Sequence, residues 1–294
     1  MIDWQKAIDS ALGRLLGDPT PPNLAASIRY SMLSPGKRFR PRLMSASALM
    51  LGVTEEDYVP FAVALEMIHG FTLIHDDLPC MDDDDLRRGM PTNHKVHGEA
   101  LALLAGDALI PAAFEWTLTS RAASAPSREP WFRAFSHLLE GSGPRGVIGG
   151  QAQEFALDSK TTLGELRTLH ALKTGALFDA ALLIPAHLAG LNPESKEFQL
   201  LKTYSQAFGL GFQVADDLED AATEWDEALG YPHTSVLSHQ SFEEARAKAI
   251  HSLESASRNL QDRWGSSAKE LELITQQLLE KLIAPTDPHP GKRR

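Results

Sequence analysis

Apolar residues recur at spacings of three and four along most of the chain, and the alternating runs typical of strands are nearly absent. A period near 3.6 residues is typical of helices that bury one face. The pattern predicts helices at residues 3–16, 24–33, 39–52, 55–77, 99–120, 129–140, 145–157, 163–190, 194–222, 242–264 and 267–283. The fold class is therefore predicted to be all-α.

Two of the predicted helices begin with a capping box. Thr162 and Ser241 each precede a glutamate by three residues, so the hydroxyl can accept from a free backbone N–H while the glutamate reaches back. A different signal occurs at Pro185, which falls inside an apolar helical run. Its ring and its missing N–H predict a kink or a break in that helix.

The predicted helices at 55–77, 163–190 and 194–222 are apolar on most sides, which is typical of helices in the centre of a bundle. The chain has no composition break, linker or repeat that requires a second domain. We therefore expect one domain over residues 1–284 and a flexible, proline-containing tail at 285–294.

Composition narrows the range of partners. The chain has 294 residues, of which 43% are hydrophobic, and a formal net charge of -11. Such an acidic chain lacks the basic surface that non-specific nucleic-acid binding needs. The first residues do not resemble a signal peptide, and no run reaches about 18 uninterrupted apolar residues. We expect a cytoplasmic protein that binds no nucleic acid and has no membrane span. Its single cysteine, Cys80, excludes an intrachain disulfide.

Two aspartate clusters stand about 140 residues apart, each at the end of an apolar helical run. The first contains Asp76, Asp77, Asp82, Asp83, Asp84 and Asp85, and the second contains Asp216, Asp217 and Asp220. A solvated acidic surface is one interpretation. However, carboxylates that continue a buried segment are costly unless a cation compensates them. Mg²⁺ suits such oxygen ligands and shares its shell with substrate phosphates. The clusters therefore indicate a metal-held diphosphate.

Basic residues lie close to these clusters in the sequence. Arg87 and Arg88 directly follow the first cluster, where fixed cations suit the oxygens of a diphosphate. Lys37 and Arg40 stand three apart at the start of a predicted helix. They fit either an ordinary basic turn or a metal-free phosphate pocket completed by His69 and Arg88.

Lys173 and Thr174 lie within an otherwise apolar helix. A buried lysine needs a partner of opposite charge, and a phosphate oxygen would serve.

Together these motifs resemble the short-chain trans-isoprenyl diphosphate synthases, in particular the bacterial farnesyl and geranylgeranyl diphosphate synthases. The most specific segment runs from Ile74 to Gly89 and continues with Pro91, Thr92, Asn93 and His94. Further matching segments follow in the family's order: Gly149-Gly150-Gln151, Lys173-Thr174-Gly175 and Phe212-Gln213. The resemblance covers nearly the whole chain.

The resemblance implies a single large helical bundle around a deep central cavity, usually as a homodimer. It implies three Mg²⁺ ions on the allylic diphosphate, held by Asp76, Asp77, Asp82, Asp216, Asp217 and Asp220. Departing pyrophosphate would be stabilised by the metals, Arg87, Lys173, Thr174 and Gln213. Isopentenyl diphosphate would bind Lys37, Arg40, His69 and Arg88. The apolar wall would shield the allylic cation from water.

The resemblance also suggests a product length. Phe71 precedes Asp76 by five residues, which places it about 7–8 Å deeper along a helix. The family uses this position as the cavity floor, and a bulky ring resembles the members that make farnesyl diphosphate. Simple core packing is the alternative role for Phe71.

The chain departs from the family pattern after Asp220. No lysine occurs between Lys202 and Lys248, so a cation that helps to hold the allylic diphosphate is missing. His233 would replace only part of that charge, and the basic end at 292–294 is a second candidate. Glu154 stands where the family commonly has aspartate. We expect activity, with altered substrate binding or chain length.

Three alternatives remain open from the sequence. The same chemistry could give geranyl or geranylgeranyl diphosphate. A terpene cyclase also uses aspartate-rich Mg²⁺ sites, but a second diphosphate pocket argues against it. A non-catalytic subunit of a heteromeric synthase would explain the missing lysine.

Overall fold

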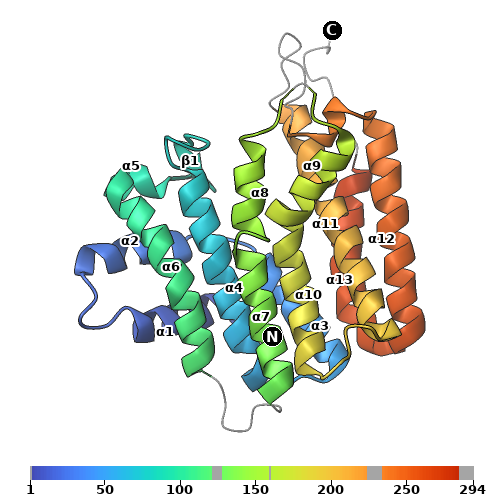
Figure 1. Cartoon of the computed structure of the whole chain (residues 1–294), viewed down its shortest axis with the longest axis horizontal. Coiled ribbons are helices and arrows are strands. Elements are labelled where there is room, and N and C mark those ends of the chain that lie inside the picture. Colours follow the sequence, from blue (N-terminus) through green and yellow to red (C-terminus); the bar gives the residue numbers. More distant parts are fainter. Residues whose placement is uncertain (1, 121–127, 159, 224–233, 285–294) are drawn as a thin grey trace. The chain divides into compact units, whose positions relative to one another are not determined.

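The computed structural model describes residues 2–120, 128–158, 160–223 and 234–284 (Figure 1). The chain divides into two compact units. The first comprises Met1–Ser45 and Thr54–Trp131, and the second comprises Ala46–Val53 and Phe132–Arg294. In the described part of the chain, nearly every element is a helix, and the only sheet has two strands of two residues each. The predicted all-α class is confirmed.

The first unit is built around two long helices, α4 and α6, which pack against each other (Figure 1). Its elements are α1 (Trp4–Leu15), α2 (Pro22–Met32), the first part of α3 (Phe39–Leu51), α4 (Glu55–Asp76), β1 (Leu86–Arg87), β2 (Met90–Pro91), α5 (Asn93–His97) and α6 (Glu99–Thr119). The close approach of α4 and α6 depends on Gly106, where a Cβ would overlap the ring of His75. The His75 Nε2 atom lies 3.0 Å from the carbonyl oxygen of Leu103.

The second unit is centred on α11, which packs against α10, α12 and α13 (Figure 1). Its elements include α7 (Arg128–Ser142, which begins in the first unit), α8 (Val147–Glu154), α9 (Leu163–His170), a π-helix η1 (Ala171–Gly175), α10 (Ala176–Leu188), α11 (Lys196–Thr223), η2 (Val236–Ser238), α12 (Phe242–Trp264), η3 (Gly265–Ala268) and α13 (Lys269–Ile283). Every residue of α10 from Leu177 to Leu188 except Asp179 is buried, as expected for a central helix.

Local signals in the sequence had mixed success. Both predicted capping boxes are present, at Thr162 and Ser241. Of the kink or break predicted at Pro185, the break is wrong, because α10 continues through it to Leu188, and the kink stays a prediction. The predicted helix 163–190 is instead interrupted by η1, where one turn of the helix widens.

Three helical stretches are long and apolar enough to cross a membrane by length and composition: α4, α6 and the continuous run Leu163–Leu188. The protein itself buries 61%, 39% and 56% of their most apolar windows, so α6 is the least covered. The tail predicted at 285–294 lies outside the described residues, and the single domain over 1–284 stays a prediction.

Candidate active site

A short β-hairpin directs two neighbouring arginines to different places within the first unit. Strands β1 and β2 pair antiparallel, and the turn between them is Arg88 and Gly89, both with positive φ (55° and 77°). Two such residues form the type of tight turn that suits the twist of a hairpin. Arg87 is the last residue of β1, whereas Arg88 lies in the turn with a left-handed backbone, so their side chains leave the hairpin in different directions. Arg87 and Arg88 therefore have different surroundings.

Arg87 forms ion pairs with residues of the first aspartate cluster. Its Nε atom donates to Asp77 Oδ1, and its Nη2 atom lies 3.0 Å from Asp84 Oδ2. Asp77 is nearly fully buried, and burial raises the pKa of its carboxyl although the bond from Arg87 opposes this. A fixed cation therefore already holds one predicted ligand in place.

The loop after α4 returns toward the end of the helix. The backbone N–H of Asp82 donates to the carbonyl oxygen of Asp76 at 2.9 Å, which brings these two aspartates together although Pro79 interrupts the chain between them. Asp82 is exposed, and Asp76 is half-buried. The structure thus places Asp76, Asp77 and Asp82 at one end of α4, as the sequence predicted.

Arg88 instead contacts the basic turn, which is the segment formed by residues 35–40. Its Nη1 atom donates to the carbonyl oxygen of Pro35 at 3.2 Å, and Gly36 leaves the space that its guanidinium occupies. Arg40 Nη1 donates to His69 Nε2 at 3.1 Å. Because arginine can only donate, the ring of His69 accepts and is neutral. The turn, His69 and Arg88 therefore belong to one region, and the metal-free phosphate pocket there stays a prediction.

Four arginines of this region act on the ring of His69. Burial first, and then the charges of Arg40, Arg88, Arg87 and Arg38, hold the pKa of His69 well below its usual value. The neutral ring does not offset the charge of these guanidinium groups, of which Arg38 and Arg87 pair with carboxylates. Such a setting favours a polyanion.

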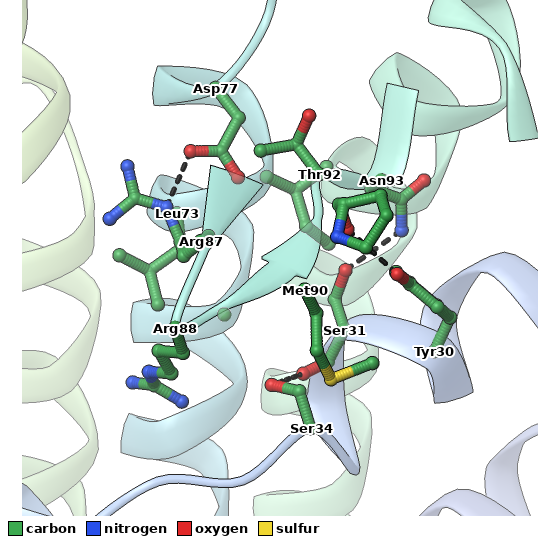
Figure 2. Close-up of a pocket in the computed structure, with 13 residues that line it drawn as sticks. Tyr30, Ser31, Ser34, Leu73, Asp77, Arg87, Arg88, Met90, Thr92 and Asn93 are labelled. Carbon is green, nitrogen blue, oxygen red and sulfur yellow. Dashed lines mark hydrogen bonds and ion pairs between the residues drawn. The ribbon is translucent and has the colours of Figure 1, made fainter. Parts of the chain in front are cut away.

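A cleft lies beside the hairpin and contains about 420 Å³ of empty space, which includes open solvent (Figure 2). It is lined by residues of α2, α4, the hairpin and α5: Tyr30, Ser31, Ser34, Gly70, Leu73, Ile74, Asp77, Arg87, Arg88, Met90, Pro91, Thr92 and Asn93. Figure 2 shows Arg87 turned to Asp77 and Arg88 turned away from it. Both arginines border the same opening.

In the second unit, the π-helix η1 presents Lys173 and Thr174. The ammonium of Lys173 pairs with Glu154 at the end of α8, and the two side chains are 26% and 20% exposed. Gly150, one turn before Glu154, permits this approach, because a Cβ there would overlap the backbone of Lys173. The partner that the sequence required for Lys173 is thus a carboxylate of the chain itself.

A hydrogen-bonded chain links η1 to the second aspartate cluster. Thr174 Oγ1 lies 3.1 Å from Gln213 Oε1, and Gln213 Nε2 donates to Asp217 Oδ1 at 2.9 Å. The other oxygen of Asp217 accepts from Ser235 Oγ at 3.0 Å and from the backbone N–H of Val236 at 2.8 Å. The structure therefore joins three predicted residues and adds Ser235 and Val236, which the sequence did not indicate.

Asp216 has a different environment from Asp217. Burial raises the pKa of Asp216 to about 7, the charge of Lys281 opposes this, and Asp220, Glu219 and Asp217 add to it. A carboxylate held among other carboxylates is stabilised by a hard cation. The oxygens of this cluster therefore fit Mg²⁺.

Among the described residues, no three His, Cys, Asp or Glu side chains are arranged to hold a metal by themselves. Because Mg²⁺ usually completes its shell with waters and substrate phosphates, this donor set still suits a metal that arrives with its substrate.

Phe71 is 4% exposed and lies on α4, with its ring in an edge-to-face contact with His75 at a centroid distance of 5.8 Å. Its buried position is compatible with both of its predicted roles. Within the altered segment after Asp220, residues 224–233, which include His233, lie outside the described residues, as does the basic end at 292–294.

The sequence did not reveal two buried groups near the basic turn. Arg38 is 8% exposed and Glu66 is 4% exposed, and the two form an ion pair at 3.1 Å. A lone glutamate inside the apolar run of α4 was the signal that could have identified them, since a buried charge requires a partner.

Comparison with known proteins gives the family. The model of the polyprenyl synthetase family matches residues 21–281. This chain belongs to the polyprenyl synthetase family. The resemblance inferred from the motifs is therefore confirmed.

Characterised relatives include both product classes. The chain is 43% identical over 201 residues to the farnesyl diphosphate synthase of Bacillus subtilis, covering 68% of this chain and 67% of that protein. It is also 43% identical over 234 residues to geranylgeranyl pyrophosphate synthase 7, chloroplastic, of Arabidopsis thaliana, covering 78% of this chain and 66% of that protein. The matched stretches thus span about two thirds of these relatives.

Solved structures that are similar to this chain support the family assignment. An FPP/GFPP synthase from Zymomonas mobilis has a TM-score of 0.82 at 35% identity, covering 94% of this chain and 96% of that one. A geranyltransferase from Legionella pneumophila has a TM-score of 0.81 at 31% identity, covering 95% and 94%.

Proposed function

We propose that this polyprenyl synthetase family member is a Mg²⁺-dependent trans-prenyltransferase. It condenses isopentenyl diphosphate with dimethylallyl or geranyl diphosphate and gives farnesyl diphosphate and pyrophosphate. The observation that carries the proposal is the division of the hairpin arginines. Arg87 lies on the aspartate cluster, and Arg88 lies on a basic turn that has no carboxylate cluster of its own. Two differently built anion sites suit two diphosphate substrates.

In this proposal the allylic diphosphate is held by Asp76, Asp77, Asp82, Asp216, Asp217 and Asp220 through three Mg²⁺ ions. Bound Mg²⁺ would supply Lewis-acid stabilisation of the departing pyrophosphate. Arg87, Lys173, Thr174 and Gln213 orient that group and donate to its oxygens. Asp77 keeps Arg87 in place, and Glu154 does the same for Lys173.

The acceptor, isopentenyl diphosphate, is held by Lys37, Arg40, His69 and Arg88. The allylic C–O bond breaks, and pyrophosphate leaves with the electron pair. The double bond of the acceptor then attacks the allylic carbon, and a proton passes from the acceptor to pyrophosphate. Because His69 is neutral and accepts from Arg40, its part is to fix the guanidinium.

We propose Phe71 as the floor that stops elongation at farnesyl diphosphate. Its ring is buried on α4, on the helix that ends at Asp76. Geranyl or geranylgeranyl diphosphate is the alternative product, and the relatives include both farnesyl and geranylgeranyl synthases.

The test is product analysis. Purified protein would be incubated with Mg²⁺, isopentenyl diphosphate and dimethylallyl diphosphate, and the dephosphorylated alcohols would be separated. Farnesol is expected. A C20 alcohol would retain the reaction and remove the floor role of Phe71. Absence of product with every allylic starter would instead favour the non-catalytic subunit of a heteromeric synthase.

We further propose a cytoplasmic homodimer that uses α6. This helix exposes Leu103, Leu104 and Leu118 at 47%, 52% and 52%, an apolar surface suited to a second copy. Light scattering on the purified protein should give twice the chain mass of 32.2 kDa. A mass of one chain would reject the dimer without affecting the proposed reaction.

A further inference from the structure

The basic turn contains a third cation, Arg38, that turns away from the other two. Arg38 is 8% exposed, whereas its neighbour Lys37 is exposed and Arg40 is half-buried. Its backbone has a φ of 45°, a conformation that side-chain-bearing residues rarely adopt. Such a conformation persists only where the surroundings hold it.

The guanidinium of Arg38 holds the end of α2. Its Nη2 atom lies 2.8 Å from the carbonyl oxygens of Met32 and Ser34 and 2.8 Å from Gln5 Oε1. The last carbonyl groups of a helix have no partner within it, and a cation is favourable at that end. One side chain therefore fixes the backbone that leads into the basic turn.

The same guanidinium reaches α4 through Glu66. Arg38 Nη1 lies 3.1 Å from Glu66 Oε1, and both side chains are buried. Glu66 precedes His69 by three residues, so the two share a face of α4. Arg40 contacts His69 at 3.1 Å. The turn is thus attached through Arg38 and Arg40 to two positions of α4 that lie about one helical turn apart.

A third contact holds the first residue of the turn, Pro35. Arg88 donates to the carbonyl oxygen of Pro35, and the absence of a Cβ at Gly36 makes room for it. Lys37 lies between these fixed points and is the exposed cation of the turn. Its direction is therefore set by backbone held on either side.

Stability alone does not explain this buried pair. Replacing a buried ion pair by apolar residues of similar volume is often neutral or stabilising, while removing one partner is strongly destabilising. Four acceptors around one guanidinium instead define a single geometry for the turn. An apolar pair would fill the space but leave the carbonyl oxygens of Met32 and Ser34 without their donor.

We propose that Arg38, anchored by Glu66, is a positioning residue that fixes Lys37 and Arg40 in the geometry that binds the diphosphate of the acceptor substrate. This inference rests on the proposed function, because that function makes the basic turn the acceptor site. Arg38 itself does not touch the substrate.

The experiment compares variants of both partners. Arg38→Lys keeps the charge but loses the planar fork, and Arg38→Met loses both. The double variant Arg38→Met with Glu66→Met removes the uncompensated carboxylate. Arg29→Lys and Arg29→Met are the matched controls, since Arg29 pairs with Asp9 at the surface of the same unit. Melting temperature, kcat and KM for each substrate are measured for all of them.

The variants are expected to change the KM for one substrate and not for the other. In Arg38→Lys and in the double variant, the KM for isopentenyl diphosphate rises about tenfold, the effect of one lost charge-assisted contact. The KM for the allylic diphosphate stays within about twofold, because its predicted ligands are elsewhere. The double variant recovers most of the melting temperature that Arg38→Met loses, because no carboxylate is left buried without a partner. If Arg38→Met does not fold, the other two variants carry the test.

Two results of these kinetic measurements would overturn the inference. One is a KM for isopentenyl diphosphate that returns to normal in the double variant together with the melting temperature, since the role would then be stability. The other is an unchanged KM in both variants.

Calorimetric binding of isopentenyl diphosphate to metal-free protein separates the inference from the proposed function. Wild type that binds it tightly but gives no product would reject the proposed function, and weaker binding by the variants would still support the role of Arg38. Wild type that does not bind it at all would reject the acceptor site and the inference with it.

Discussion

Lys173 and Glu154 form an ion pair within the second unit, between the π-helix η1 and the end of α8. Lysine has three N–H donors, so its ammonium can keep the carboxylate while it reaches a phosphate oxygen with another. The carboxylate then has two opposing effects. It fixes the direction of the ammonium, and it weakens the attraction of the ammonium for an anion.

Glu154→Gln should therefore change kcat and KM in the same direction. The KM for the allylic diphosphate falls because Lys173 is no longer neutralised, and kcat falls about tenfold because the ammonium is less well placed. Steady-state kinetics check this, with the exposed Glu243→Gln as the control. An unchanged kcat would show that Glu154 does not position Lys173.

Gly150→Ala should damage the same site through the backbone. An added Cβ would overlap the backbone N and Cα atoms of Lys173, so α8 and η1 must separate. Overpacking of this kind costs about 1–3 kcal/mol of unfolding free energy. We expect that loss in denaturant unfolding, together with a lower kcat. Gly164→Ala is the control, because the nearest atom to its Cβ lies 3.8 Å away. Equal stability of the two variants would contradict the close packing of α8 on η1.

Phe71→Ala should lengthen the product from C15 toward C20, because the ring would no longer close the cavity. The same change should cost about 3–5 kcal/mol of unfolding free energy as a buried aromatic is lost. Phe61→Ala is a matched control that removes a fully buried ring on the same helix, packed on Trp131 at a centroid distance of 5.8 Å. Chromatography of the alcohols gives the length. Equal products from both variants would remove Phe71 as the floor.

His187 should make the protein less stable in acid. Burial lowers the pKa of His187 to about 4, and its Nδ1 atom has no hydrogen-bond partner. In the unfolded chain this pKa is about 6.5, so below pH 6.5 the unfolded state binds the proton and the folded state does not. The free energy of unfolding therefore falls as the pH drops from 6.5 toward 4, by at most about 2 kcal/mol at pH 5 from this residue.

His187→Phe keeps a ring and its tilted contact with Phe198 but removes the titration. Its unfolding free energy, measured with denaturant at pH 7 and pH 5, should change less between the two than that of wild type. The exposed His251→Phe should behave like wild type. A pH response of His187→Phe equal to that of wild type would show that the residue is not responsible.

Periodicity predicted most of the helices because each buries one face or all of its faces. Helix α12 was predicted with its observed bounds, Phe242–Trp264, since a capping box marks its start. The π-helix was not predicted, because one widened turn hardly alters the spacing of apolar residues. Strands β1 and β2 were not predicted either, because two residues are too few to show a period of two.

The candidate site was predicted where chemistry follows from residue type. The aspartates and the exposed or half-buried cations of the basic turn could be chosen from their charge and spacing. The role of Arg38 could not, because its partner Glu66 lies 28 residues away and only the fold brings the two together. The pairing of Lys173 with Glu154 could not be predicted for the same reason, because the two residues are 19 positions apart in the sequence.

The hairpin carries one consequence for the distance between two reacting molecules. Arg87 and Arg88 are joined by a single peptide bond, so their Cα atoms are about 3.8 Å apart whatever the helices do. If Arg87 holds the allylic donor and Arg88 holds the acceptor, the distance between the two Cα atoms is set by covalent geometry rather than by packing. Small movements of the helices would then shift both diphosphates together. An insertion of one residue between the two arginines would lengthen this spacing, and the donor and acceptor diphosphates would be held farther apart.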